Sequence, residues 1–447
     1  MALIKLKRGY DLNLAGKIAR DISREAIATA PLGKTVAVVP DDFEGIIPRM
    51  EKKVGDHVVV GEPLYHDKNH ESIKVTSPVS GTVTEVRRGE RRKIEAIVIE
   101  PDGNQDRRTF DTKGSVKTLL LESGLWAMMR QRPYDIVPSP EVAPRDIAVT
   151  AFDSAPLAPS LLDILGDDKK YIARGIEALK TLTEGDVLVG AREGDSFDAG
   201  SAVVNHFKGP HPAGNAGVQL ANVKPVNKGE TVWTLDIVTV ARLGKLLESG
   251  KLSTDTVVAL VGSEVSEPKL IKAVMGQEIS TLVKGELKES KAEPRIISGN
   301  VLTGVKVEAE GYLRAPYRQI TVIPEVAHPD EFMGWASLST KKFSVYRDFI
   351  GTIFGLDKKE HRLDAKINGG ERAIVMSGEY DRMLPMDILA EFLIKAIISR
   401  DIDKMEQLGI YEVAPEDFAL AEMACTSKLE LQRIVREGLN YLRSEME

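Results

Sequence analysis

The sequence predicts a multi-domain chain of mixed α/β and α+β class. Its 447 residues are enough for about three domains of ordinary size, with room for a small fourth. With 43% apolar and 28% charged residues, each domain can bury a core of its own. The hydrophobic pattern changes three times along the chain, which marks the expected boundaries. The expected units are a β-rich domain at 1–103, an α/β domain at 104–254, a small α+β module at 255–328, a connecting segment at 329–374 and a helical domain at 375–447.

The first unit has the pattern of β structure. Short runs of Val, Ile and Thr, as in TVAVVP at 35–40, IKVTSPVSGTVTEV at 73–86 and KIEAIVIE at 93–100, are separated by Gly, Pro and Asp. This spacing is typical of hairpins in a small sandwich or barrel.

In the second unit the apolar period lengthens to that of a helix. The segment SVKTLLLESGLWAMMRQ, at 115–131, is expected to form a helix that stops before Pro133. Two continuous apolar runs, at 146–152 and 186–191, have strand length, and helical patterns lie between and after them. Strands that alternate with helices predict a parallel, doubly wound sheet.

The last two structured units differ in composition. Within 255–328, strands are expected at 257–262 and 318–325. The segment PKLIKAVMG, at 268–276, is expected to be a short helix because Pro begins it and Gly ends it. From 375 onward, several amphipathic segments predict a small helical bundle.

Bulk charge and composition argue against several classes of protein. A net charge of −7 does not suit a general nucleic-acid-binding protein. The basic cluster within 87–93 is expected to be a solvated hairpin turn. No apolar run approaches the ~18–20 residues of a membrane helix, and the N-terminus lacks the apolar core of a signal peptide. The single cysteine, Cys425, suits a reducing compartment. The chain is expected to be soluble, and any link to a membrane is expected to run through partner subunits.

The sequence contains no complete motif for holding a redox cofactor or a metal. Neither G-x-G-x-x-G nor a Walker A loop occurs, and one thiol cannot hold an Fe–S cluster. His66 and His70 fall in a predicted hairpin, where their spacing does not suit a metal. The glycine-rich loop Gly209–Gly217, GPHPAGNAG, has two interpretations: an ordered surface loop, or a nest of backbone amides that binds an anion.

Trp126 also has two interpretations. A tryptophan among apolar neighbours is usually part of a core. Trp126 lies close to Met128 and Met129, however, and aromatic and methionine side chains also line pockets for quinone-like ligands. Both interpretations stay open at this point.

Part of the first unit resembles the biotinyl/lipoyl-type barrel-sandwich fold. The resemblance rests on KVGDHVVVGEPLY at 53–65, followed by the segment at 73–86. In carrier domains a lysine at a hairpin tip, within Asp-Lys-Ala or Met-Lys-Met, takes the swinging cofactor. Here the region reads YHDKNHES, and Lys68 lacks that flanking pattern. The resemblance therefore implies the fold without a modified lysine.

Further segments resemble one family, the A subunits of the sodium-translocating NADH:quinone oxidoreductases. The resemblance runs from residue 2 to about 440 in the same order. The segments that carry it are KLKRGYDLNLAG at 5–16, ESGLWAMMRQRPY at 122–134, FKGPHPAGNAGVQL at 207–220, PRIISGNVLTG at 294–304, KKFSVYRDFIG at 341–351, YDRMLPMDIL at 380–389 and EDFALAEMACTSK at 416–428.

That family is similar in turn to the flavin-carrying subunit of respiratory complex I and to the corresponding subunit of the Rnf complex. The similarity implies a Rossmann-like domain, a β-grasp module of the SLBB (soluble-ligand-binding) type and a helical domain related to an Fe–S domain. This sequence departs from those relatives twice. Bulky residues follow Ser123-Gly124-Leu125, where the relatives carry a glycine-rich flavin loop, and only Cys425 is left of the cluster cysteines.

The resemblance implies a subunit without bound cofactor at the cytoplasmic face of the inner membrane. The complex as a whole would oxidise NADH, reduce ubiquinone to ubiquinol and export Na⁺. Its flavins, its Fe–S cluster and the sodium path would lie in partner subunits, some of them embedded in the membrane, and the isolated chain is expected to be inactive. No catalytic, cofactor-binding or metal-binding residue is expected in this chain. Trp126, Met129, Arg130 and His211 are the candidates for a contribution to quinone binding.

Two other functions stay open. One is a free-standing flavin-dependent NADH oxidoreductase of the same fold, which would be coloured when purified. The other is a biotin or lipoyl carrier modified at Lys68, which would show the added group in its intact mass.

Overall fold

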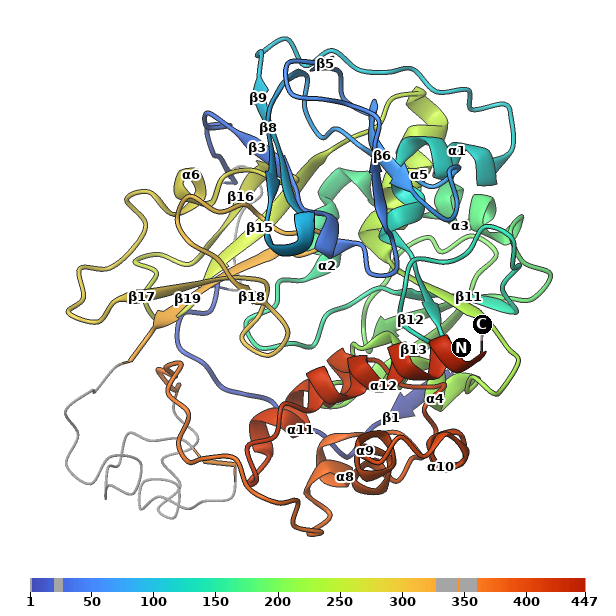
Figure 1. Ribbon diagram of the computed structural model, residues 1–447, viewed down its shortest axis with the longest axis vertical. Helices are drawn as coiled ribbons and strands as arrows, with labels where there is room; N and C mark the ends of the chain where they lie inside the picture. The colour runs from blue at the N-terminus through green and yellow to red at the C-terminus, as the bar shows by residue number, and fades with distance from the viewer. Residues whose placement is uncertain (1, 20–26, 327–343, 346–359, 447) are drawn as a thin grey trace.

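The computed structural model describes residues 2–19, 27–326, 344–345 and 360–446. Figure 1 shows two small sheets from the first hundred residues at the top and a sheet flanked by helices on the right. A second large sheet lies on the left, and helices α8 to α12 run along the lower part of the molecule. The mixed α/β and α+β class expected from the sequence is present.

Residues 36–101 form a sandwich of two antiparallel sheets, with strand orders β3-β9-β8-β5 and β4-β6-β7. Side chains from both sheets, such as Val83 and Leu64, are fully buried in one core. The expected sandwich is therefore present. Its elements are β3 (Val36–Val38), η2 (Pro40–Asp42), β4 (Pro48–Met50), β5 (His57–Val58), β6 (Pro63–Asp67), β7 (Lys74–Thr76), β8 (Gly81–Arg88), η3 (Glu90–Arg92) and β9 (Ile94–Pro101).

Two short strands before residue 30 pair outside this sandwich. β1 (Ala2–Lys5) pairs in parallel with β13 (Val203–Lys208) of the α/β domain, and β2 (Ala28–Thr29) pairs in parallel with β16 (Lys269–Val274) of the third sheet. The expected boundaries of the first unit, 1–103, stay a prediction. A short strand that completes the open edge of a distant sheet leaves no local pattern that names its partner.

The α/β domain contains a six-stranded sheet of order β1-β13-β12-β11-β14-β10, parallel except for β10 at one edge. Ile147 and Val149 face the large core on the side of α3 and α5, whereas Ala148 faces the α4 side. Helices on both faces confirm the doubly wound arrangement. Its elements are α1 (Val116–Ser123), η4 (Leu125–Met128), β10 (Arg130–Arg132), β11 (Asp146–Thr150), α2 (Leu161–Leu165), η5 (Gly166–Tyr171), α3 (Ile172–Lys180), β12 (Val187–Arg192), β13 (Val203–Lys208), α4 (Ala216–Val223), β14 (Val232–Asp236) and α5 (Ile237–Ser249).

The third sheet has the order β18-β17-β19-β15-β16-β2, with β15 and β19 parallel at its centre. The helix expected at 268–276 is wrong, because Lys269–Val274 forms β16, antiparallel to β15. Leu270 and Ile271 are both buried, on opposite faces of the sheet, and such a run cannot be told from a buried helix by its period. The other elements are β15 (Asp255–Val261), α6 (Ile279–Val283), β17 (Pro294–Ser298), β18 (Val305–Lys306) and β19 (Gln319–Pro324).

The C-terminal part is helical, as expected, and shares a core with residues of the α/β domain such as Phe207 and Val218. Most of the connecting segment expected at 329–374 lies outside the described residues, which here comprise 344–345 and 360–374. The elements are α8 (Glu379–Met383), α9 (Ala390–Ile398), α10 (Ile402–Gln407), η8 (Pro415–Phe418), α11 (Ala419–Ala424) and α12 (Leu431–Met446).

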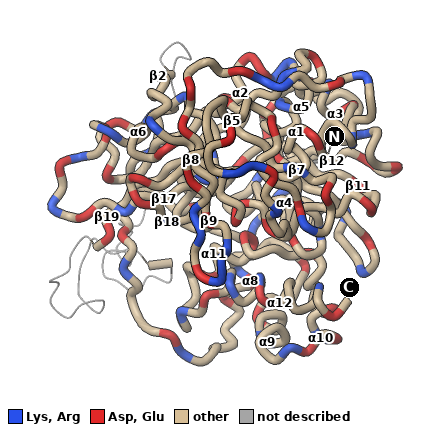
Figure 2. Tube along the Cα trace, turned by 45° about the horizontal axis from the view of Figure 1, so that its top comes forward, with Lys and Arg blue, Asp and Glu red and all other residues tan. Residues whose placement is uncertain are grey.

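The surface carries mixed charge, and the basic cluster lies where it was expected, around the turn between β8 and β9 (Figure 2). Arg87 pairs there with Glu85, and Lys93 pairs with Asp41. Within the described ranges, no helix combines the length and the apolar character needed to cross a bilayer.

Candidate functional site

An apolar cavity lies where the sandwich, the α/β domain and the third sheet meet. Each of the three units contributes part of the wall, and most of the lining side chains are apolar. The lining residues are Ala37, Val38, Val39, Asp42, Phe43, Val75, Thr76, Pro78, Ser123, Gly124, Leu125, Met128, Leu252, Met275, Gly276, Leu313 and Ala315.

Asp42, at the end of η2, forms hydrogen bonds that link the three units beside this cavity. Its carboxylate accepts hydrogen bonds from Arg314 Nε at 2.7 Å and from the Ala315 amide at 2.9 Å. Its backbone carbonyl accepts a bond from Arg130 Nη2 at 2.6 Å. Burial raises the pKa of Asp42 to about 6, although the neighbouring Arg314 acts in the opposite direction.

A glycine turn brings the α/β domain to the cavity wall. α1 ends at Ser123, and Gly124 takes the left-handed conformation with φ of 80°. A Cβ at Gly124 would lie 2.9 Å from Thr76 Oγ1, so no larger residue fits this contact without a shift. The helix expected over 115–131 is therefore corrected to α1 followed by the short helix η4, which presents Met128 to the cavity.

Trp126 and Met129 are fully buried and are not among the residues that line the cavity. The Trp126 ring packs edge-on against Trp233 with centroids 4.9 Å apart, and its indole N–H donates to the Pro138 carbonyl at 2.8 Å. The structure therefore favours the core interpretation of Trp126. Of the two neighbouring methionines, it is Met128 that reaches the cavity.

Arg130 lies one contact away from the cavity rather than in its wall. Besides its bond to Asp42, its guanidinium donates to the carbonyls of Ala127 and Met129, both at 3.1 Å. Arg130 thus holds the turn between η4 and β10 against η2 and positions Asp42.

His211 lies away from this cavity, in the glycine-rich loop Gly209–Gly217. Its backbone N–H donates to Asp11 at 2.8 Å, and its Nδ1 lies 3.0 Å from Ser154 Oγ. The Gly214 amide also donates to Ser154 Oγ, at 2.8 Å. Since these two amides already have acceptors within the chain, the anion-nest interpretation of the loop is not supported. The four sequence candidates therefore do not converge on one site.

The groups that a flavin or an Fe–S cluster would need are engaged elsewhere. Trp126 and Met129 fill the region after Gly124 with core side chains. Cys425 is buried, and its Sγ lies 3.0 Å from Tyr380 Oη. In the part of the chain that the structure describes, no group of three or more His, Cys, Asp or Glu side chains could hold a metal ion. Among the described residues, the segment after Gly124 therefore does not fit a flavin and the surroundings of Cys425 do not fit a cluster.

The two histidines of the predicted hairpin have carboxylate partners. His66 lies 2.8 Å from Glu51, and His70 lies 3.2 Å from Asp67. Lys68 is exposed in the turn between β6 and β7.

Sequence reasoning missed most of the cavity. Its wall is built from positions as far apart as Ala37, Leu252 and Leu313, each of which looks like ordinary core in its own segment. The only signal was the methionine pair beside Trp126.

Models of protein families match three consecutive regions. Residues 4–102 match the NqrA N-terminal barrel-sandwich hybrid domain, residues 111–252 match the NqrA second alpha/beta domain, and residues 257–309 match the NQRA C-terminal domain.

Full-length relatives have the same assignment. The chain is 37% identical over 456 residues to the A subunit of the Na(+)-translocating NADH-quinone reductase of Photorhabdus laumondii, with 99% of this chain and 100% of the relative covered. Identity is 36% to the same protein of Vibrio anguillarum and 35% to that of Saccharophagus degradans, with the same coverage. Among solved structures, an NAD⁺-reducing [NiFe]-hydrogenase gives a TM-score of 0.36 at 11% identity over 75% of this chain and 62% of that chain, which is too low to establish a common fold.

The three family models match in order along the chain, and the relatives are more than 30% identical over the whole length. The chain therefore belongs to the NqrA family, the A subunits of the Na(+)-translocating NADH-quinone reductases.

Proposed function

We propose that this chain is the cytoplasmic, cofactor-free subunit of a membrane complex that oxidises NADH, reduces ubiquinone to ubiquinol and exports Na⁺. We further propose that the cavity between its three domains contributes to quinone binding. The observation that carries the second proposal is an apolar cavity where three domains meet, in a chain of this family.

The lining of the cavity suits a quinone ring in its chemistry. Pockets for small ligands are commonly lined by apolar side chains with a few polar groups. Here Phe43, Leu125 and Met128 supply apolar contacts. The hydroxyl groups of Thr76 and Ser123, two further lining residues, donate to the backbone carbonyls of Ser123 and Leu120. Such a lining accepts a flat, neutral ring.

The packing described above supports a subunit that binds no flavin or cluster. We assign residues 104–254 to a Rossmann-like domain whose flavin region is filled by Trp126 and Met129. We assign 255–328 to a β-grasp module of the SLBB type. The domain at 375–447 then corresponds to an Fe–S domain in which Cys425 is a core residue. The electron carriers belong to the partner subunits.

Photolabelling of the intact, detergent-solubilised complex with a photoreactive ubiquinone tests the proposal. We expect the label on peptides that contain 37–43, 123–128 or 313–315, with competition by unlabelled ubiquinone. Labelling confined to other subunits would remove quinone binding from this chain. Failure of the chain to co-fractionate with NADH-oxidising membrane partners would contradict membership of the complex.

The purified chain also decides between this proposal and its two alternatives. We expect no visible flavin absorbance and an intact mass equal to that of the unmodified sequence. Stoichiometric flavin absorbance would favour a free-standing oxidoreductase, and an added lipoyl or biotinyl mass at Lys68 would favour a carrier.

A further inference from the structure

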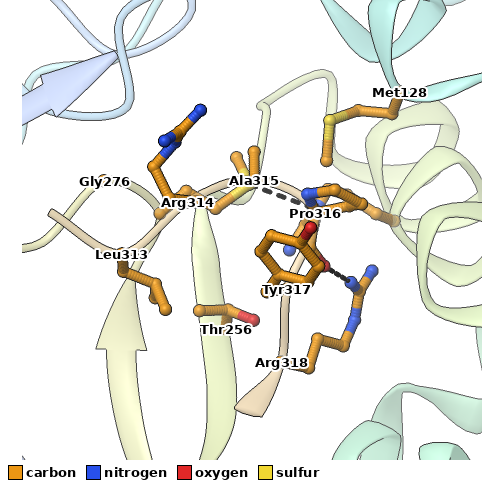
Figure 3. Close-up of a pocket in the computed structure, with 11 residues that line it drawn as sticks. Met128, Thr256, Gly276, Leu313, Arg314, Ala315, Pro316, Tyr317 and Arg318 are labelled. Atoms are coloured by element: carbon orange, nitrogen blue, oxygen red, sulfur yellow. Dashed lines mark hydrogen bonds between the residues drawn. The ribbon is translucent and has the colours of Figure 1, made fainter. Parts of the chain in front are cut away.

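A second, smaller pocket adjoins the apolar cavity and has arginines among its lining residues. It shares Met128, Met275, Gly276, Leu313 and Ala315 with the cavity. Its remaining lining includes three arginines, Arg242, Arg314 and Arg318. Figure 3 shows Arg314 and Arg318 extending from the segment that also carries Pro316 and Tyr317. The cavity therefore adjoins a small pocket whose lining residues include three arginines, which we call the arginine pocket.

The positive charges of the arginine pocket exceed the carboxylates that pair with them. Arg314 pairs with Asp42 at 2.7 Å, and Arg318 pairs with Asp236 at 2.9 Å. The guanidinium of Arg242 instead donates to the Asp255 carbonyl at 3.0 Å and to Met275 Sδ at 3.4 Å. In the described ranges the structure gives Arg242 no carboxylate within ion-pair distance.

Both Arg242 and Arg318 are buried, with 6% and 9% of their surface exposed. Arg318 Nε is a buried donor without a hydrogen-bond partner. Burial, followed by repulsion from Arg318, lowers the pKa of Arg242 to about 10, and attraction from Asp236 and Asp255 does not compensate. A buried cation or donor without a partner is costly, so an anion in this pocket would stabilise the arrangement.

We propose that the arginine pocket is the anion subsite of the quinone cavity and that it binds a negatively charged ring oxygen. The inference rests on the proposed quinone binding. It adds a preference: the site takes a quinonoid ligand with an ionised oxygen, such as a quinol anion, more tightly than the neutral quinone. Arg242 and Arg318 supply the hydrogen bonds and the charge, and the apolar cavity holds the rest of the ligand.

Two naphthoquinones of similar size separate charge from shape. 2-Hydroxy-1,4-naphthoquinone is an anion at pH 7, and 2-methyl-1,4-naphthoquinone is neutral. Isothermal titration of the full-length chain is expected to show tighter binding of the anion by about tenfold or more, since hydrogen bonds to charged groups are the stronger ones. No preference between the two compounds in the wild-type chain would overturn the inference without the need for any variant.

Variants then assign the preference to the arginine pocket. Arg242→Met and Arg318→Met are each expected to weaken binding of the anion by about tenfold and to change binding of the neutral compound by less than about twofold. Arg87→Met, at an exposed arginine of the β8–β9 hairpin, is the matched control and should change neither. Arg242→Lys keeps a charge at the same position, so it should retain part of the preference if the methionine variants fail to fold.

The outcomes separate the two proposals. If neither compound binds and the photolabel avoids the cavity, the quinone cavity itself is wrong. If both bind and the arginine variants weaken them equally, the cavity stands and the anion subsite falls.

Discussion

Two places where domains meet are built in opposite ways. At the junction of the α/β domain with the C-terminal helices, the buried polar groups mostly find partners within the chain. Arg132, 1% exposed, pairs with Asp417 at 3.5 Å and with Glu416 at 3.2 Å, and the Asn215 side chain also donates to Asp417. At the three-domain cavity, the apolar walls leave a space and Arg242 faces it without a carboxylate.

The difference gives a criterion for separating a structural junction from a binding site. Where buried charges balance inside the protein, as around Arg132, the parsimonious role is to hold two domains together. Arg132 Nε and His211 Nε2 also lack hydrogen-bond partners, so an unmatched nitrogen alone does not mark a binding site. The contrast rests on the open space beside Arg242, which has no carboxylate within ion-pair distance among the described residues. The predictions below test this contrast, from the largest expected effect to the smallest.

Trp126→Ala should produce the largest loss of stability. The change removes a fully buried ring, its contact with Trp233 and the bond to the Pro138 carbonyl. We expect a loss of about 3–5 kcal/mol in the free energy of unfolding of the α/β domain, measured by urea unfolding followed by far-UV circular dichroism. Phe392→Ala, at a half-exposed aromatic on α9, is the control and should cost about 0.5 kcal/mol or less. A small loss of unfolding free energy in Trp126→Ala, together with weaker quinone binding, would instead indicate that Trp126 contacts the ligand.

Asp417→Asn should destabilise the structural junction by about 3 kcal/mol, because it leaves the buried Arg132 with Glu416 as its remaining ion-pair partner among the described residues. Glu416 is a weak replacement, since burial, followed by repulsion from Asp417, raises the pKa of Glu416 to about 8. The unfolding midpoint in urea gives the measurement. Glu437→Gln makes the same chemical change in an exposed pair with Arg433, where about 0.5 kcal/mol or less is expected. Equal losses in the two variants would mean that the Arg132 cluster is not the link between the domains.

The sequence predicts the sheets of this molecule better than its junctions. The runs at 146–152 and 186–191 identify β11 and β12 because a buried parallel strand is continuously apolar. Lys269–Val274 is assigned wrongly because its length and composition suit a helix as well as a strand. β1 and β2 escape notice because their partners lie far along the chain.

The candidate site is predicted less well, for a related reason. Local patterns report whether a side chain is apolar and not whether it faces a core or a cavity. Met128 and Met129 are adjacent and alike, yet only Met128 reaches the cavity, because Gly124 and η4 fix the direction in which each points. The arginine pocket combines Arg242 of α5 with Arg318 at the start of β19, a pairing that requires the folded chain.

Met128→Trp should affect ligand binding more than stability. A larger side chain at a position shared by the cavity and the arginine pocket fills space that the ligand would use. We expect about tenfold weaker quinone binding by titration, equivalent to roughly 1.4 kcal/mol, with a smaller change in unfolding free energy. Met446→Trp makes the same change at an exposed position of α12 and should leave binding unaltered. Unchanged quinone affinity in Met128→Trp would contradict the cavity as the quinone site.

The pH dependence of the structural junction should come in part from His211. Burial lowers the pKa of His211 to about 4, below its ordinary value of 6.5, because the protonated ring loses hydration and gains only Ser154 as a partner. The unfolded chain therefore binds a proton more readily than the folded one below pH 6.5. The contribution of His211 to stability is complete above pH 6.5 and is lost as the pH falls from 6.5 towards 4.

We expect a loss of roughly 1 kcal/mol between pH 6.5 and 5.5 that His211→Asn abolishes, since one pKa unit corresponds to about 1.4 kcal/mol. Hydrogen exchange of the amides at 209–215 locates the effect, because these amides pack against residues 9–11 and Ser154. His206, a half-buried histidine on β13, provides the matched control as His206→Asn, which should keep the wild-type slope. If stability depends on pH in both variants as it does in the wild-type chain, His211 is not the source of the pH sensitivity. The structural junction is then held by packing and by the Arg132 cluster alone.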